Sequence, residues 1–138
     1  MRTSSSDMGR IVAQVQVTNA VDTSRQLAVS GLVDTGAAYL TLPAAWKDHL
    51  APFVSTQIVD VETAAQETVR GEVCGPARIE IEGFRPIYSE VLFIEMHPDA
   101  GVYEPLIGYL PLEQSQAAVD MLGHRLVHWR RVDLKKIA

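Results

Sequence analysis

Apolar and polar residues alternate in several short runs along this chain, and turn-forming residues separate the runs. Between Ile11 and Val17 every odd position is apolar, which predicts a half-buried strand. Arg25–Val33 is predicted as a second strand, and the turn formers between Asn19 and Ser24 join the two into a hairpin. The chain therefore begins its folded part as a β structure.

Short strands and short helices are predicted along the rest of the chain. Pro43 is expected in the first turn of a short helix that presents Trp46 and Leu50 on one apolar face. Further strands are predicted over 58–61, 69–73, 77–82, 84–94, 106–109, 117–121 and 125–132, with a helical turn or two over 111–116. Many short strands without a βαβ rhythm predict a mostly β fold, a compact closed barrel with one or two short helices.

Length and composition limit the organisation of the chain. With 138 residues it forms one domain with a modest core. Residues 1–8 include three serines in a row and have no apolar face, so they are expected to be a disordered tail. Residues 9–138 then make up the single domain.

Charge, cysteine content and hydropathy limit the expected partners and location of the protein. A formal net charge of −5 argues against a nucleic-acid-binding surface. A basic cluster near the end is interpreted as the charged edge of a strand; it comprises Arg125, Arg130, Arg131, Lys135 and Lys136. Cys74 is the single cysteine, so we expect a buried thiol in a reducing compartment. No apolar stretch approaches the roughly 18 residues of a membrane span, and residues 1–10 do not read as a secretion signal. The expected location is cytoplasmic, with no membrane partner.

One acid interrupts an apolar stretch between Gly31 and Pro43. Asp34 follows the end of one predicted strand and precedes another at Tyr39–Leu42. A buried carboxylate costs several kcal/mol unless it is paired or protonated, so Asp34 is a candidate functional residue. The alternative is an Asx-turn, in which Asp34 only caps the turn by accepting a following amide.

The residues around this acid resemble a known family. Two apolar residues followed by Asp34-Thr35-Gly36-Ala37 are similar to the active-site loop of the retropepsin-like (clan AA) aspartic proteases. Leu106-Ile107-Gly108 matches the apolar-apolar-Gly signature that these proteases carry after their flap. The resemblance runs from about Ile11 to about Val132 and implies a single retropepsin-like domain. It assigns catalysis to Asp34 and the active-site loop to Thr35, Gly36 and Ala37.

The resemblance also implies a substrate groove and a flap. The groove is expected at Ala38, Ile107 and Gly108. The flap is the predicted hairpin after the first helix, and its tip is expected at Ala64, Ala65, Gln66 and Glu67. This tip departs from the viral pattern because it has no glycine.

Peptide hydrolysis of this type needs two carboxylates about 3 Å apart that share one proton. One activates a water and the other protonates the developing oxyanion. Because the chain has a single Asp-Thr-Gly, the resemblance implies a homodimer in which a twofold axis pairs two copies of Asp34. Thr35 is then expected to hydrogen-bond across the axis. The implied activity is that of an aspartic endopeptidase acting on a peptide or protein substrate, with no metal or other cofactor.

Several alternatives stay open. The principal one is a dimer of the same fold that cleaves little and serves as a peptide-binding or scaffolding module. The dimer strands are expected near Ile11–Val17 and Leu126–Val132, with Trp129 either an interface anchor or a core residue. His124 and His128 are interpreted as surface residues and not as metal ligands, because their segment reads as a strand. No motif of serine hydrolases or nucleotide binders occurs.

Overall fold

The computed structural model describes residues 10–63 and 65–129, so the predicted tail and most of the basic cluster lie outside it. No helix in these ranges combines the length and the apolar character that crossing a membrane would require. The described residues form the α-helices α1 (Lys47–Leu50) and α2 (Tyr109–Gln114), and a 3₁₀ turn, η2 (Ala44–Trp46), precedes α1. The strands are β1 (Val12–Asn19), β2 (Gln26–Val33), β3 (Leu40–Pro43), β4 (Ser55–Glu62), β5 (Thr68–Ile81), β6 (Ile87–Ile94), β7 (Leu106–Ile107), β8 (Ala117–Asp120) and β9 (Arg125–His128).

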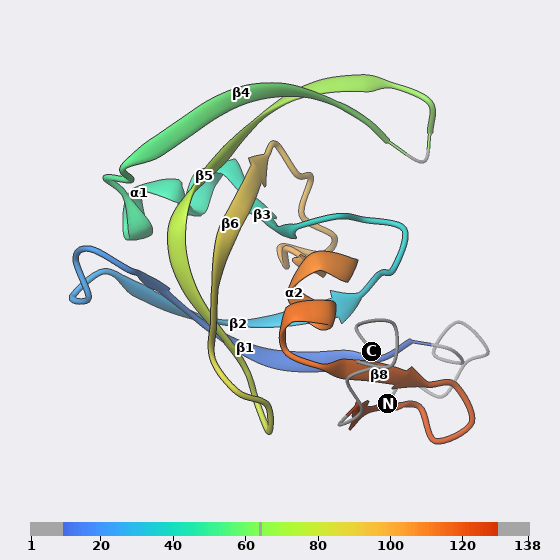
Figure 1. The fold of residues 1–138 in the computed structure, drawn as a ribbon. Helices are drawn as coiled ribbons and strands as arrows, with labels where there is room; N and C mark the ends of the chain where they lie inside the picture. Colours follow the sequence, from blue (N-terminus) through green and yellow to red (C-terminus); the bar gives the residue numbers. More distant parts are fainter. Residues whose placement is uncertain (1–9, 64, 130–138) are drawn as a thin grey trace, which may run out of the picture.

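Six of the described strands close into a ring. The order is β1, β2, β7, β3, β6 and β5, and β5 then pairs with β1. Strand β4 adds to the outer side of β5, and β8 with β9 forms a separate hairpin (Figure 1). The prediction of a mostly β fold with short helices is confirmed, and the ring is the predicted closed arrangement.

Strand β5 combines two strands that the sequence analysis predicts separately, over 69–73 and 77–82. Its register against β6 shifts between Cys74 and Ala77, which marks a bulge at Gly75-Pro76. A proline fits there because a bulge does not need its missing N–H. The prediction of two separate strands is therefore wrong, and the continuity of β5 matters for closing the ring. The first half of β5 pairs with β4, and the second half pairs with β1 to close the ring.

The hairpin of β4 and the first half of β5 arches over the rest of the molecule (Figure 1). Its antiparallel register runs from Ser55 opposite Gly75 to Glu62 opposite Thr68. Since β4 has β5 as its neighbour in the sheet and no strand on its other side among the described residues, its outer edge is open. This hairpin occupies the position that the sequence analysis expects for the flap.

Alternation along the strands builds the core inside the ring. Ile79 and Ile81 on β5 are fully buried, as are Leu40 and Leu42 on β3, while Phe93 on β6 is 1% exposed. The short helices differ slightly from prediction. Pro43 is the last residue of β3 and not part of a helix, and α2 begins before Pro111, at Tyr109.

Cys74 is buried in this core, as the sequence predicts. The Thr56 hydroxyl lies 3.6 Å from its sulfur. Burial raises the pKa of the Cys74 thiol above its ordinary value, because the thiolate would lose its hydration. We therefore assign Cys74 a packing role.

Asn19 joins the first hairpin to the segment after α1. Its side-chain amide donates to the carbonyls of Leu50 (2.8 Å) and Pro52 (2.6 Å). Its side-chain oxygen accepts the N–H groups of Val21 (2.9 Å) and Asp22 (3.0 Å). The residue is 1% exposed and its hydrogen bond to the Leu50 carbonyl is buried, so truncation would leave that carbonyl without a partner in the protein interior.

We expect Asn19→Ala to lower the free energy of unfolding by about 2–4 kcal/mol. The measurement is urea denaturation at one fixed protein concentration. Gln16→Ala is the matched control, because Gln16 makes only a surface hydrogen bond to Gln26 of 2.7 Å and should cost about 0.5 kcal/mol or less. Equal losses in the two variants would contradict the role given to Asn19.

Candidate functional site

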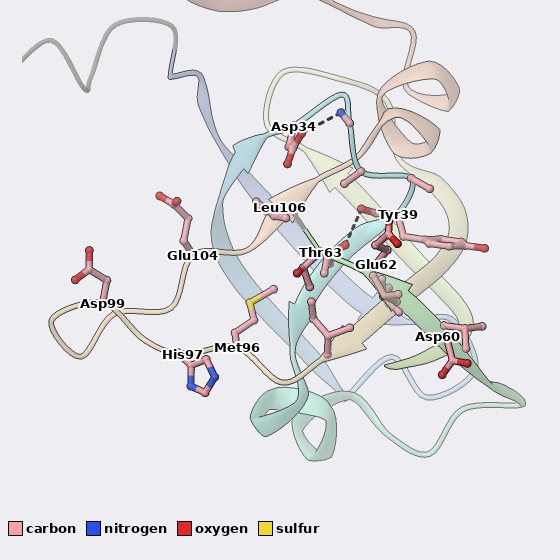
Figure 2. Close-up of a pocket in the computed structure, with 18 of the residues that line it drawn as sticks. Asp34, Tyr39, Asp60, Glu62, Thr63, Met96, His97, Asp99, Glu104 and Leu106 are labelled. Carbon is pink, nitrogen blue, oxygen red and sulfur yellow. Dashed lines mark hydrogen bonds between the residues drawn. The ribbon is translucent and has the colours of Figure 1, made fainter. Parts of the chain in front are cut away.

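Asp34 lies where β2 ends and the chain turns toward β3. Its backbone N–H donates to the carbonyl of Ile107 at 3.0 Å, which fixes the start of the loop. Carboxylate Oδ1 accepts the N–H of Gly36 at 2.9 Å (Figure 2). This is the hydrogen bond of the Asx-turn alternative. Oδ2 has no hydrogen-bond partner among the described residues, so the carboxylate keeps acceptor capacity for a further group.

Strand β7 holds both ends of the Asp34 loop. It pairs in parallel with β2, Val33 opposite Ile107, and antiparallel with β3, Leu40 opposite Ile107. One short strand thus fixes the entry and the exit of the loop. The Leu106-Ile107 pair is apolar because it sits between two strands of the ring, and Ile107 is 1% exposed.

The residues that follow β7 brace the loop from behind. The N–H groups of Gly108, Tyr109 and Leu110 donate to the carbonyls of Tyr39 (3.1 Å), Ala37 (2.9 Å) and Ala38 (2.9 Å), respectively. A Cβ at Gly108 would lie 2.5 Å from the carbonyl carbon of Ala38. Glycine is required here because the two backbones approach too closely for any side chain.

The tip of the loop is uncovered in the single chain. Thr35 and Gly36 are exposed, whereas Asp34 and Ala37 are partly buried. The Thr35 hydroxyl makes no hydrogen bond to another residue in the described ranges. Asp34 is thus less buried than the apolar sequence around it suggests, and full burial would need a second surface over the tip.

A large cleft opens beside Asp34, with a volume of about 1090 Å³. The loop residues Gly36–Tyr39 line it on one side, and β4 from Val59 to Glu62, with the following Thr63, lines it on the flap side. Figure 2 shows Asp34 and Leu106 between Asp60 on one side and Asp99 with Glu104 on the other. The volume is comparable with that of ligand-binding clefts in proteins, which reach about 1,000 Å³.

The predicted groove residues divide into two groups. Ala38 lines the cleft, but Ile107 and Gly108 do not: they are buried behind the loop and support it. At the flap tip, Ala65, Gln66 and Glu67 do not line the cleft either, and Ala64 lies outside the described residues.

The turn at the flap tip forms without a glycine. The Thr63 N–H donates to the carbonyl of Glu67 at 2.8 Å, and the Gln66 N–H donates to the carbonyl of Thr63 at 2.9 Å. Gln66 takes the left-handed conformation with φ 63°, a position that favours glycine. The departure from the viral sequence pattern therefore has a local cost in backbone strain.

One wall of the cleft was not foreseen from the sequence. It is formed by the end of β6, the loop that follows and the start of β7, with the lining residues Leu92, Ile94, Met96, His97, Asp99, Val102, Glu104 and Leu106. The feature of the sequence that could have predicted this wall is the period-two spacing of Leu92, Ile94 and Met96. These residues line the cleft, while Val91 and Phe93 are buried in the core.

Contacts fix this loop against the body of the domain. Asp99 and Val102 exchange two backbone hydrogen bonds of 2.9 Å each. Tyr103 packs edge-on against Trp46, with ring centroids 5.6 Å apart. Glu104 forms an ion pair with Arg10. These contacts therefore hold the wall of the cleft in place.

The two histidines of the last hairpin lie on different parts of it. His128 lies on β9, where its Nε2 is 2.8 Å from the carbonyl of Gly83 and its ring packs on Phe84. His124 lies in the preceding turn. Within residues 10–63 and 65–129 no group of three or more His, Cys, Asp or Glu side chains is placed to hold a metal ion.

The predicted dimer strands are partly occupied within the chain. From Val15 onward β1 has β2 on one side and β5 on the other, so that part cannot offer an edge to a partner. Trp129 is 57% exposed, which rules out the core alternative and leaves its ring available to an interface. Residues 130–132 of the last predicted strand lie outside the described residues.

Comparison with known proteins places the fold. No family model matches the chain, and no curated protein sequence matches it. The structure of EIAV protease complexed with the inhibitor HBY-793 is similar, with a TM-score of 0.53 and 20% sequence identity, covering 75% of this chain and 86% of that chain. The crystal structure of Lpg0085, a protein of unknown function (DUF785) from Legionella pneumophila subsp. pneumophila, matches with a TM-score of 0.37 and 15% identity over 75% of this chain and 84% of that one. The first likeness shows a retropepsin-like fold; the second is too weak to carry an argument.

Proposed function

We propose that this protein is an aspartic endopeptidase that works as a homodimer, with Asp34 of each copy forming one catalytic pair. The observation that carries the proposal is the position of Asp34. It sits on a loop braced by β7 and Gly108, at the edge of a cleft of about 1090 Å³, within a retropepsin-like fold. Loop, cleft and arching hairpin together fit the cleavage of an extended peptide.

The proposed mechanism needs both carboxylates. A water held between the two Asp34 side chains loses a proton to the ionised one and attacks the scissile carbonyl. The protonated one hydrogen-bonds to the carbonyl oxygen and stabilises the charge that develops there. Proton transfer to the amine then releases the two product peptides. The free Oδ2 of Asp34 is available for this chemistry, while Oδ1 is oriented by the Gly36 N–H.

Two features support pairing of the loops across a twofold axis. The loop tip at Thr35 and Gly36 is exposed in the single chain, and the Thr35 hydroxyl has no partner within the described residues. A second copy of the loop would cover the tip and supply an acceptor for that hydroxyl. Trp129, which is 57% exposed, is a further candidate anchor for a partner.

Dilution tests the proposal. Half a site has no activity, so the specific activity falls as the protein is diluted below the dissociation constant of the dimer. We expect this loss to coincide with the shift from dimer to monomer in analytical ultracentrifugation at the same concentrations. A specific activity that stays constant while the protein becomes monomeric would refute the paired site.

A peptide-binding module is the second candidate function, and the backbone conformation at the flap tip favours it. Gln66 in a left-handed conformation makes a glycine-free tip, and a stiff tip would slow the opening and closing that turnover needs. In that case the cleft binds peptides without appreciable cleavage.

A further inference from the structure

Polarity is distributed unevenly over the cleft. Its buried and partly buried lining is mostly apolar and includes Leu92, Ile94 and Leu106. The exposed lining residues include four acids, Asp60, Glu62, Asp99 and Glu104. These acids come from β4 on one side and from the loop after β6 on the other. The cleft thus has a mostly apolar interior and an acidic rim.

The rim is largely uncompensated. Glu104 pairs with Arg10, which does not itself line the cleft, but Asp60, Glu62 and Asp99 form no ion pair with another described residue. Arg70 faces Asp60 across the β4–β5 register without making an ion pair. Among the described lining residues there is no lysine or arginine, and His97 is the single basic side chain.

We propose that the cleft selects peptides with an apolar centre flanked on both sides by lysine or arginine. This inference rests on the proposed function, because it takes the cleft beside Asp34 as the substrate site. Uncompensated charges of one sign around a low-dielectric cleft focus the field and raise the local concentration of the opposite charge. A twofold axis would repeat the same acids on the other half of the groove, so both flanks of a peptide would meet negative charge.

The primary test measures binding, so that it does not depend on turnover. Three fluorescent peptide pools share randomised apolar central residues and carry lysine, serine or glutamate at both ends. They are titrated into the Asp34→Asn protein at neutral pH. We expect the lysine-ended pool to bind at least about tenfold more tightly than the glutamate-ended pool at low salt, with the serine-ended pool between them. The difference should shrink at about 0.5 M salt, where screening is strong.

Matched variants assign the preference to the rim. Asp60→Asn, Glu62→Gln and Asp99→Asn together should reduce the lysine-to-glutamate affinity ratio to about threefold or less. The control combines Asp48→Asn, Glu82→Gln and Glu113→Gln, three exposed acids outside the cleft lining that give the same change in net charge. It should keep the ratio of the parent. Equal binding of all pools, or an equal effect of both variants, would overturn the inference.

The same pools are also incubated with the protein that retains Asp34. This experiment distinguishes a failure of the proposed lysine preference from a failure of the protease proposal. Cleavage without a preference for lysine ends would refute the inference and leave the protease proposal standing. Preferential binding of lysine-ended peptides without any cleavage would refute the protease proposal and leave the inference standing.

Discussion

Replacing Asp34 by asparagine should lower kcat/KM for every cleaved peptide by at least about 10³-fold. Asparagine keeps the size of the side chain and an oxygen that can accept the Gly36 N–H, which lies 2.9 Å from Oδ1 in the structure. It cannot take a proton from water at any accessible pH, so the pair loses its general base and its shared proton. The loss should therefore be chemical and not structural.

Two further measurements make this prediction specific. Asp34→Asn should retain the dimer mass and bind peptides about as tightly as the parent, since the substitution changes neither the backbone hydrogen bonds that hold the loop nor the size of the side chain at the cleft. Asp48→Asn, the same substitution at an exposed acid outside the cleft, should retain full activity. An unchanged cleavage rate in Asp34→Asn would show that the cleavage has another source, and the enzyme assignment would be lost.

Gly108→Ala should be the most destabilising small substitution in the site, with a loss of about 3 kcal/mol or more. The added Cβ would lie 2.5 Å from the carbonyl carbon of Ala38 and 2.6 Å from the carbonyl oxygens of Ala38 and Tyr39. These are backbone atoms that cannot rotate away, so the loop or β7 must move. Where the variant stays folded, the shift of the Asp34 loop should cost about 10²-fold in kcat/KM.

Gly101→Ala is the control for Gly108→Ala. Gly101 has φ +78° and no atom within 4 Å of its ideal Cβ, so the substitution meets backbone strain without a collision. Its expected cost is about 1–2 kcal/mol. Thermal and urea unfolding of the two variants at equal protein concentration measures the difference. A cost for Gly108→Ala no larger than that for Gly101→Ala would mean that the close backbone approach does not constrain the site.

The Asp34 loop could be anticipated because its constraints are local. An acid between two apolar strands, a following glycine and Leu106-Ile107-Gly108 downstream are all readable in the chain. The structure links them: β7 holds both ends of the loop, and the N–H groups after it hold the loop carbonyls. What the sequence could not show is the degree of burial. Asp34 is partly exposed in the single chain because the surface that would cover it belongs to another molecule under the proposal.

The cleft wall and strand β5 were harder to predict because their form is set by distant contacts. Gly75-Pro76 reads as a break in sequence, yet β4 and β1 pair on either side of it and keep the chain extended. The loop after β6 reads only as irregular by composition. Its place in the cleft depends on Trp46 and Arg10, which contact Tyr103 and Glu104 from far away in the chain. Local patterns do not contain this information.

Under the proposed mechanism one Asp34 is inactive and two of them act together. This can be measured by mixing: the parent and the Asp34→Asn protein are combined in equal amounts, allowed to exchange subunits, and assayed at constant total protein. Random pairing leaves about one quarter of the dimers with two Asp34 residues, so we expect about one quarter of the activity of the parent alone. About one half of the parent activity would mean that each chain works by itself and would refute the paired site.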